Sequence, residues 1–433
     1  MIPAARIQAA IEVLDAIAGD ARPADLVTRR YLRKRRYIGS KDRRAITARV
    51  YAVLRAAAAL DWRISHHGGD AGGGDAGARA RVLLHVASEG GLDAVTALCD
   101  GAQYAPPALR DDETAMIAAA LADDGTVMPR AVRIGYPGWL EPALIDRFGD
   151  DLESEAAALV GEAALDVRVN ELAASRDEML ATLASLGLEA QPTPLSPIGI
   201  RLAGRPNITG HEAYRDGQIE IQDEGAQLVS LLVGGGDEAV VIDFCAGAGG
   251  KTLAIAARLS ATARLIASDT DGGRLKRMEP RLARAGIKGV ETHVLVADDP
   301  WLGEQDGVAD RVLVDMPCSG TGTWRRAPDQ PGRLTPERLG QYQREQIAIL
   351  EQAAKLVRPG GRLIFATCSV LRSENEDQIT SFLDRNEFRV LKIADVWAET
   401  IGGAAPAAGE SLQLTPGRHG TDGFFVAVLE KKS

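Results

Sequence analysis

The sequence lacks the features that define several protein classes. Its four cysteines, Cys99, Cys245, Cys318 and Cys368, lie far apart, and it has no CxxC pair and no clustered histidines. These absences argue against a disulfide framework and against a zinc site. No run reaches eighteen apolar residues, and the N-terminus has no apolar segment after a basic stretch, so neither a membrane span nor a secretory leader is expected. We expect a reduced, cytoplasmic monomer with no metal and no membrane partner.

Basic residues are also in the minority, but they are unevenly placed. With 50 basic and 60 acidic residues the net charge is -10, which taken alone argues against a nucleic-acid partner. Between Arg29 and Arg55, however, eleven basic residues face one acidic residue, a local charge of +10 that leaves -20 on the rest of the chain. Tyr31, Tyr37 and Tyr51 lie among these cations, so the segment offers both phosphate contacts and base stacking, although a solvated helix face is the alternative. The predicted RNA contacts in this segment are Arg33, Lys34, Arg35, Arg36, Arg43 and Arg44.

The length of 433 residues predicts two or three domains. Composition and hydrophobic spacing divide the chain into four parts. Alanine, leucine and valine at helical spacing predict a helical bundle over residues 1–130, with a glycine-rich loop from His66 to Ala78. Residues 131–165 are expected to form a helical connector, and residues 166–222 a small α+β segment. From 223 to 433, strands alternate with long helices, which predicts a doubly wound parallel sheet.

A glycine loop follows the first strand of this last part. In VIDFCAGAGGKT the glycines Gly247, Gly249 and Gly250 stand between a buried strand and a helix, where a ligand can approach the backbone. A Walker A loop is excluded because Cys245 stands where it requires glycine. A nicotinamide dinucleotide and S-adenosylmethionine both remain possible, since each uses an acid such as Asp269, 20 residues after Gly249, to hold ribose hydroxyls. Asp298 could accept from an adenine amine. The alternative is that these residues only mark strand ends.

Two cysteines end two other predicted strands. Cys318 lies in DMPCSGTG and Cys368 in TCS, so both are expected at the strand ends that face the glycine loop. A single buried cysteine is usually a small hydrophobe, but loop residues such as Pro317 make that interpretation weaker for the pair. A thiolate that adds to carbon 6 of a pyrimidine activates carbon 5 for methylation, and an acid near ring nitrogen 3, here Asp315, stabilises the adduct. The residues alone do not say which cysteine attacks.

Four segments in this order carry a family resemblance. DFCAGAGGKT, DMPCSGTGTWRRAPD, LVRPGGRLIFATCSVLRSENE and LTPGRHGTDGFFVAVLEK resemble the Sun/RsmB family of bacterial RNA (cytosine-5)-methyltransferases. The N-terminal helices look like the NusB-type RNA-binding bundle of the RsmB subgroup. The resemblance implies a multidomain fold: an all-α NusB-like bundle, a small α+β linker segment and a Rossmann-like class I methyltransferase domain. The sequence departs from the family at Ala248, where proline is usual.

The resemblance also implies roles for individual residues. Cys368 would be the nucleophile, Cys318 would assist product release, and Asp315 would lie between the cofactor and the base. The cofactor, S-adenosyl-L-methionine, would be contacted by Cys245, Ala246, Gly247, Ala248, Gly249, Gly250, Lys251, Asp269, Asp298 and Asp315. Arg325 and Arg326, which follow the PCSG motif, are further candidate RNA contacts. The basic helix face of Arg274, Lys276, Arg277, Arg281 and Arg284 is expected to be solvated surface.

The expected activity is therefore methylation of carbon 5 of a cytosine in RNA, with small-subunit ribosomal RNA as the favoured substrate. The same chemistry on transfer RNA or large-subunit ribosomal RNA is an alternative. A non-catalytic RNA-binding assembly factor is a second, although it would not need Cys368, Cys318 and Asp315 together. A methyltransferase for a small molecule or a protein is a third, and it would leave the +10 segment without a purpose.

Overall fold

The computed structural model describes residues 1–70, 72 and 75–433, and the chain forms two compact units. The helical unit comprises Met1–Gly161 together with Trp324–Leu334. The sheet unit comprises Glu162–Thr323 together with Thr335–Ser433. The predicted loop from His66 to Ala78 includes positions 71, 73 and 74, which lie outside the described residues.

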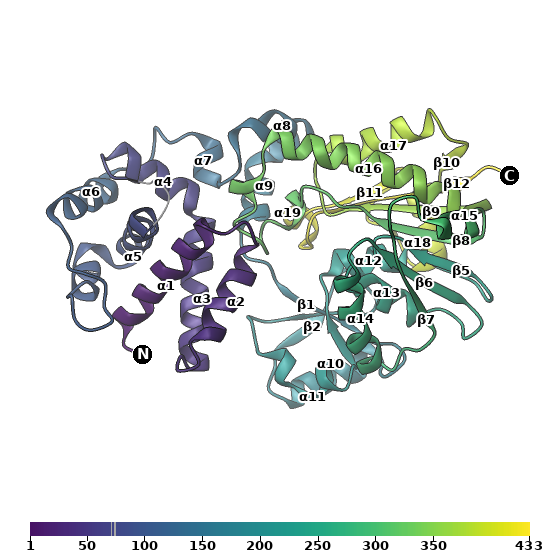
Figure 1. Ribbon diagram of the computed structural model, residues 1–433, viewed down its shortest axis with the longest axis horizontal. Helices are drawn as coiled ribbons and strands as arrows, with labels where there is room; N and C mark the ends of the chain where they lie inside the picture. Colours follow the sequence, from purple (N-terminus) through teal and green to yellow (C-terminus); the bar gives the residue numbers. More distant parts are fainter. Residues whose placement is uncertain (71, 73–74) are drawn as a thin grey trace. The chain divides into compact units, whose positions relative to one another are not determined.

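The helical unit is built from alanine-rich amphipathic helices (Figure 1). Its helices are α1 (Pro3–Ala18), α2 (Ala24–Lys34), α3 (Ser40–Arg55), α4 (Ala57–His66), α5 (Asp75–Leu98), α6 (Asp111–Ala122), α7 (Arg130–Ile134), α8 (Glu141–Phe148) and α9 (Leu152–Val160). Ile7, Ile11 and Leu14 recur at helical spacing on α1 and are buried with Ile46 and Val50 of α3 in one core. This confirms the predicted helical N-terminal region.

The segment Trp324–Leu334 belongs to this unit although it lies within the range 223–433 predicted for the methyltransferase domain. The Asp329 carboxylate accepts the backbone N–H of Ala24, at the start of α2, at 3.1 Å. The Arg333 guanidinium donates to the carbonyl oxygens of Asp20 and Ala21, both at 3.1 Å. Polar groups at the ends of α1 and α2 therefore receive their partners from a segment about 300 residues later.

A small antiparallel sheet opens the sheet unit. Its elements are β1 (Leu165–Val169), α10 (Arg176–Ser185), β2 (Ala190–Pro192), β3 (Gly199–Leu202), α11 (Glu212–Arg215) and β4 (Ile219–Ile221), and the strand order is β2-β3-β1-β4. Val167 and Val169 alternate along β1 and pack with Ile200 and with Met179 of α10. Ser175 caps α10 by accepting the N–H of Glu178.

The larger sheet has the order β10-β12-β9-β8-β5-β6-β7, and β11 also pairs with β12. Its elements are α12 (Glu224–Leu231), β5 (Val240–Asp243), α13 (Gly250–Ala256), β6 (Arg264–Asp269), α14 (Gly272–Arg284), β7 (Val290–Val294), α15 (Pro300–Glu304), β8 (Ala309–Asp315), α16 (Pro336–Leu356), β9 (Val357–Thr367), α17 (Glu376–Leu383), β10 (Phe388–Val390), α18 (Ile393–Thr400), β11 (Ser411–Leu414), α19 (Pro416–His419) and β12 (Phe424–Lys431). Strands β5 to β9 are parallel, whereas β12 runs antiparallel to β9. The chain reverses its direction across the sheet between β5 and β8, where doubly wound sheets bind ligands.

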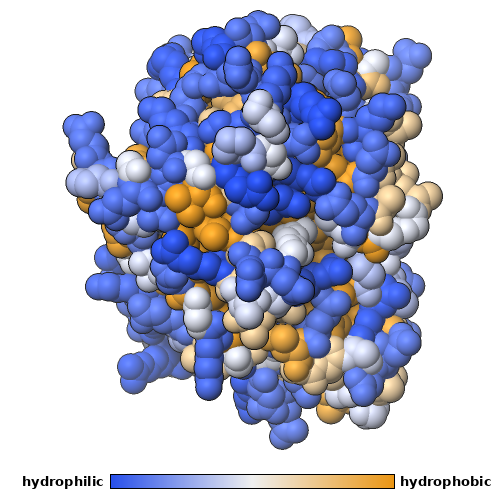
Figure 2. All heavy atoms as spheres, turned by 90° about the vertical axis from the view of Figure 1, so that its right-hand side faces the viewer, coloured by the Kyte–Doolittle hydropathy of each residue, from blue (hydrophilic) through white to orange (hydrophobic). Residues whose placement is uncertain are grey.

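Helices cover both faces of this sheet, which confirms the predicted α/β domain (Figure 1). Val241 and Leu313 face α12, α13 and α18, whereas Ile242 and Val312, one residue away along their strands, face α16 and α17. The face of the sheet unit in Figure 2 carries mostly hydrophilic side chains, with hydrophobic residues visible in hollows between them. Among the described residues, no helix is both long and apolar enough to cross a membrane.

Candidate active site

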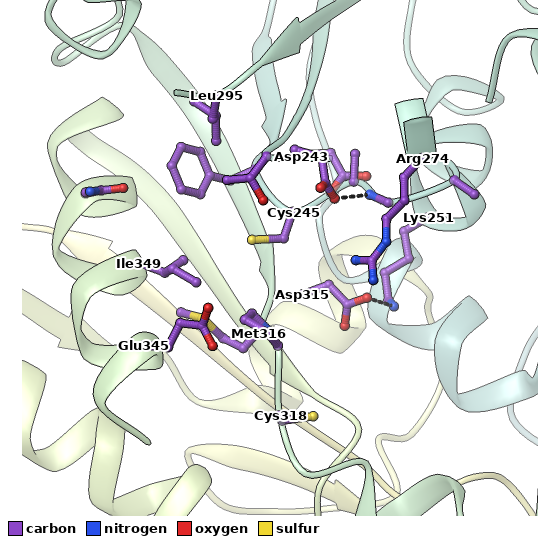
Figure 3. Close-up of a pocket in the computed structure, with 18 of the residues that line it drawn as sticks. Asp243, Cys245, Lys251, Arg274, Leu295, Asp315, Met316, Cys318, Glu345 and Ile349 are labelled. Atoms are coloured by element: carbon purple, nitrogen blue, oxygen red, sulfur yellow. Dashed lines mark hydrogen bonds and ion pairs between the residues drawn. The ribbon is translucent and has the colours of Figure 1, made fainter. Parts of the chain in front are cut away.

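The carboxyl ends of β5, β6, β8 and β9 border one cavity of about 1130 Å³ in the sheet unit (Figure 3). Ten of the predicted catalytic and cofactor-binding residues line it: Cys245, Ala246, Gly247, Ala248, Gly250, Lys251, Asp269, Asp315, Cys318 and Cys368. Two predicted cofactor contacts, Gly249 and Asp298, are not among the lining residues. The side chain of Asp298 is exposed, in a left-handed backbone conformation (φ 52°).

The glycine loop has a conformation that explains its composition. Gly249 has φ 80°, and a Cβ atom there would lie 2.3 Å from Cγ of Met278, so a side chain at this position meets both strain and a clash. Gly247 is also left-handed (φ 57°), and its N–H donates to the Asp269 carboxylate at 2.8 Å. The same carboxylate accepts the N–H of Asp271 at 2.8 Å. Asp269 thus holds the loop in place and still lines the cavity.

The basic face of α14 is solvated surface only in part, because Lys276 and Arg277 are exposed whereas Arg281 and Arg284 are engaged by other groups. Arg281 donates to the carbonyl oxygen of Ala248 in the glycine loop. Arg281 and Arg284 both form ion pairs with Glu220 of β4. Arg274 lines the cavity. Periodicity identified the face correctly as basic, but the acidic partner lies more than sixty residues earlier in the chain.

A partly buried ion pair lines the cavity. The Lys251 ammonium donates to the Asp315 carboxylate at 2.5 Å, and Figure 3 shows the pair between Cys245 and Cys318. Burial alone would lower the pKa of Lys251, but the charge of Asp315 and the hydrogen bond to it outweigh burial and raise that pKa. Burial, followed by the negative charges of Asp315, Asp243 and Asp269, raises the pKa of the Cys245 thiol. Cys245 is therefore a neutral thiol at neutral pH.

The two candidate catalytic cysteines are brought together. The Sγ atoms of Cys318 and Cys368 lie 3.4 Å apart, and both cysteines are free thiols. Their loops are joined because Gly322 donates its N–H to the carbonyl oxygen of Cys368 at 2.9 Å. The hydrogen bond with Cys368, burial, and the charges of Cys368 and Glu374 raise the pKa of Cys318 well above its ordinary value.

A buried carboxylate that the sequence pattern does not indicate lies next to this pair. Glu374 is fully buried and accepts from the N–H of Ser319 at 2.8 Å and from the hydroxyl of Ser369 at 2.6 Å. Gln346 of α16 donates to Glu374 at 3.2 Å and to the carbonyl oxygen of Pro317 at 3.0 Å. Glu374 follows Cys368 by six residues, but the sequence carried no signal that its side chain turns back towards the cysteine loops.

The remaining wall of the cavity suits a nucleoside cofactor. Apolar surface is supplied by Leu295, Leu302 and Ile349, the last of these from α16. The carboxylate of Asp269 can accept from ribose hydroxyls, and the carboxylates of Asp243 and Asp315 suit a cation such as a sulfonium. The residues present therefore fit S-adenosylmethionine.

The basic segment of the helical unit presents part of its charge to solvent. Arg33, Lys34, Arg36 and Arg44 are exposed, and Tyr37 is 76% exposed. The other two predicted contacts there are engaged within the unit. Arg35 lies over the Tyr31 ring and pairs with Glu12 at 3.1 Å, and Arg43 donates to the carbonyl oxygen of Ile38 at 2.7 Å.

Other predicted RNA-contacting side chains differ in exposure. Tyr31 is buried and donates its hydroxyl hydrogen to Glu12 at 2.6 Å, so its ring is not free to stack on a base. Arg325 is 4% exposed, whereas Arg326 is exposed. The exposed predicted contacts are therefore Arg33, Lys34, Arg36, Arg44 and Arg326.

Two family models and several named proteins match parts of this chain. Residues 231–430 match the family model of the 16S rRNA methyltransferase RsmB/F, and residues 136–209 match that of the RsmF/B-like ferredoxin-like domain. The ribosomal RNA small subunit methyltransferase B of Shewanella oneidensis is 34% identical over 297 residues, 68% of this chain and 67% of that protein. The probable ribosomal RNA small subunit methyltransferase B of Synechocystis sp. is 33% identical over 299 residues, with the same coverage.

The fold is similar to those of solved structures. The crystal structure of PH0851 superposes with a TM-score of 0.79 at 25% identity and covers 100% of this chain and 99% of its own. A methyltransferase homolog from Pyrococcus horikoshii superposes with a TM-score of 0.60 at 25% identity, over 70% of this chain and 97% of its own. Fold, cavity and sequence relatives lead to one conclusion: this chain belongs to the RsmB/F family of ribosomal RNA small-subunit methyltransferases.

Proposed function

We propose that this enzyme methylates carbon 5 of a cytosine in RNA, through a covalent adduct between Cys368 and carbon 6 of the base. The observation that carries the proposal is the pair of free thiols, 3.4 Å apart, in the cavity that also holds the Lys251–Asp315 ion pair. A methyltransferase that transfers to oxygen or to an amine needs no second thiol beside the first. Small-subunit ribosomal RNA is the proposed substrate, because relatives at about one third identity are named for it.

Cys368 is the proposed nucleophile, and Lys251 supports it electrostatically. A thiolate must be the attacking form, and a nearby cation favours the thiolate. The charge of Cys368 contributes to the raised pKa of Lys251, so the two groups interact. The Cys368 thiolate adds to carbon 6, and the electron pair displaced from the carbon 5–carbon 6 bond makes carbon 5 a nucleophile.

Asp315 is the proposed carboxyl partner of ring nitrogen 3. Its hydrogen bond from Lys251 places an ammonium and a carboxylate together, so that a proton shared by this pair is available to the ring nitrogen as the adduct forms. S-adenosylmethionine supplies the methyl group as an electrophile. Loss of the carbon 5 proton to a base then lets the bond from carbon 6 to Cys368 break, and Cys318 assists this release through its contact with the departing sulfur.

The RNA is proposed to be held outside the cavity. Attack at carbon 6 comes from above the plane of the base, so the cytosine must be unstacked or already single-stranded. The exposed cations Arg33, Lys34, Arg36 and Arg44 are proposed to contact phosphates, and Tyr37 is available to stack on a base. These contacts position the strand and need not read its sequence.

Paired cysteine variants test the proposal. Cys368→Ala is expected to abolish methylation while leaving S-adenosylmethionine affinity within about twofold, because only the nucleophile is lost. Cys318→Ala is expected to accumulate a covalent protein–RNA adduct, visible as a slowly migrating band on a denaturing gel. Methylation is measured by bisulfite sequencing of ribosomal RNA from cells that carry each variant as the only copy.

The control is Cys99→Ala, a buried cysteine of the helical unit that lies outside the cavity. Its methylation is expected to match wild type. Methylation by Cys368→Ala would rule out the nucleophile assignment. A wild-type protein that modifies transfer RNA or large-subunit RNA and leaves small-subunit RNA unmodified would keep the chemistry and change the substrate.

A further inference from the structure

Glu374 is a carboxylate that receives four hydrogen bonds in a place closed to solvent. Its Oε1 atom accepts from the N–H of Ser319 at 2.8 Å and from the Gln346 amide at 3.2 Å. Its Oε2 atom accepts from the hydroxyls of Ser319 and Ser369. The side chain is fully buried. Because an unpaired buried carboxyl group is costly, these four hydrogen bonds hold the Glu374 side chain in this position.

Two of the three residues that donate to Glu374 are neighbours of the cysteines in the sequence. Ser319 directly follows Cys318, and Ser369 directly follows Cys368. Thr321 strengthens the same junction, since its hydroxyl lies 3.0 Å from that of Ser369 and accepts the N–H of Val370 at 3.0 Å. Glu374 therefore ties the end of β8 to the end of β9, and these are the two loops whose thiols must meet.

The charges around the two thiols are arranged unequally. Lys251 from α13 interacts with Cys368, whereas Glu374 acts on Cys318 through its charge. Asp315 from β8 is paired with Lys251, and Asp243 from β5 and Glu345 from α16 act on Cys245. Arg338 also lines the cavity from α16.

We propose that Glu374 is a positioning residue that fixes the two cysteine loops against each other, with its carboxylate acting on the Cys318 side of the thiol pair. This inference deepens the proposed function and rests on Cys368 being its nucleophile. The two sulfur atoms lie 3.4 Å apart and border the same cavity, so the loops that carry them must be held in register.

Glu374→Gln separates the charge of this residue from its geometry. Its amide oxygen can replace Oε1 and accept from Ser319 and Gln346, and its NH₂ group can replace Oε2 by donating to the two serine hydroxyl oxygens, since hydroxyls both donate and accept. Glu374→Ala removes both charge and geometry. Asp377→Asn, at an exposed carboxylate in the first turn of α17, is the matched control.

The first measurement is independent of RNA. Cys318 is followed in a Cys368→Ser background and Cys368 in a Cys318→Ser background. The pH profile of iodoacetamide alkylation in the full-length protein is measured at that one residue by peptide mass spectrometry, because Cys99 and Cys245 are also free thiols. Glu374→Gln is expected to move the Cys318 profile about one unit towards lower pH, with a smaller shift for Cys368. Asp377→Asn is expected to move neither. Superimposed Cys318 profiles with and without the Glu374 charge, or equal shifts at both cysteines, would overturn the charge role.

The second measurement is turnover on RNA. Glu374→Ala is expected to lose about 100-fold in kcat with little change in the KM for S-adenosylmethionine, because the thiols are no longer held in register. Glu374→Gln, which keeps the loops tied, is expected to restore at least about a tenth of wild-type kcat. Wild-type kcat in Glu374→Ala would overturn the positioning role. If the wild-type protein methylates no cytosine, the proposed function fails, and the alkylation profiles still decide the role of Glu374.

Discussion

At the scale of single residues, the cavity concentrates carboxylates that differ in how well they are stabilised. Asp243 is buried at the end of β5, where the Thr252 hydroxyl donates to its Oδ2 at 2.6 Å. Its Oδ1 has no hydrogen-bond partner among the residues that the structure describes. Burial, opposed by the Thr252 hydrogen bond and reinforced by the charge of Asp315, raises the pKa of Asp243 to about 7. The group therefore becomes charged within the physiological range in the absence of a bound cation.

The raised pKa of Asp243 predicts how the stability of the cofactor-free protein depends on pH. The native state keeps its proton up to about pH 7, while the unfolded state loses it near pH 4, so the contribution of Asp243 to stability is present at low pH and lost as pH rises through this window. Asp243→Asn removes the dependence. Between pH 5 and pH 8 the free energy of unfolding of the cofactor-free wild type is expected to fall by about 3 kcal/mol relative to Asp243→Asn.

Urea unfolding of both proteins at the two pH values measures this difference, because other groups titrate equally in both. Asp384→Asn, at an exposed carboxylate, serves as the control and should track the wild type. A wild type and Asp243→Asn that keep a constant difference from pH 5 to pH 8 would show that the Asp243 carboxyl is ionised throughout.

The sequence predicts which residues border the cavity where the end of a parallel strand determines their position. Cys318 and Cys368 were expected to share a crevice because parallel strands end at one edge of the sheet, and they lie 3.4 Å apart. It did not identify Glu374, since a residue in a turn before a helix can face either way. It also did not separate Asp298, which is exposed, from Asp269, which lines the cavity.

At the scale of elements, the glycine loop between β5 and α13 depends on the packing of α14. Gly249→Ala is expected to reduce stability by about 2 to 4 kcal/mol, because it adds left-handed strain and brings a Cβ to 2.3 Å from Met278. Gly286→Ala is the matched control, because Gly286 has φ 70° but no atom lies within 4 Å of the added Cβ. Its loss of stability is therefore expected to come from backbone strain alone. Chemical denaturation measures the difference, and equal losses would show that Met278 gives way without cost.

The main strands were predictable because they are short runs of β-branched and leucine residues bounded by turns, as in β5, β6 and β8. Strands such as β2 and β10 have three residues each, too few to show any period. Their existence depends on pairing with β3 and β12, which local sequence does not specify. The antiparallel β12 likewise depends on its long ladder with β9.

In the molecule as a whole, the helical unit contains both the +10 segment and a segment from much later in the chain. The helical unit carries the +10 segment within a chain of net charge -10. It also contains Trp324–Leu334, which follows the cysteine loop of Cys318 by a few residues and supplies partners to α1 and α2. Deleting the helices would therefore also leave this segment without its partners, so point substitutions at exposed cations test RNA binding more cleanly.

Replacing Arg33, Lys34, Arg36 and Arg44 together by Gln is expected to weaken RNA binding at least about tenfold at physiological salt, and to reduce the slope of log K against log salt by about 3, since four phosphate contacts release their counterions. Four exposed cations of the sheet unit, Lys276, Arg277, Lys288 and Lys392, replaced in the same way, form the control for total charge. Filter binding across a salt series measures both slopes. Equal loss of slope in the two variants would mean that net charge alone attracts the RNA, whereas loss confined to the first places the phosphate contacts on the helical unit.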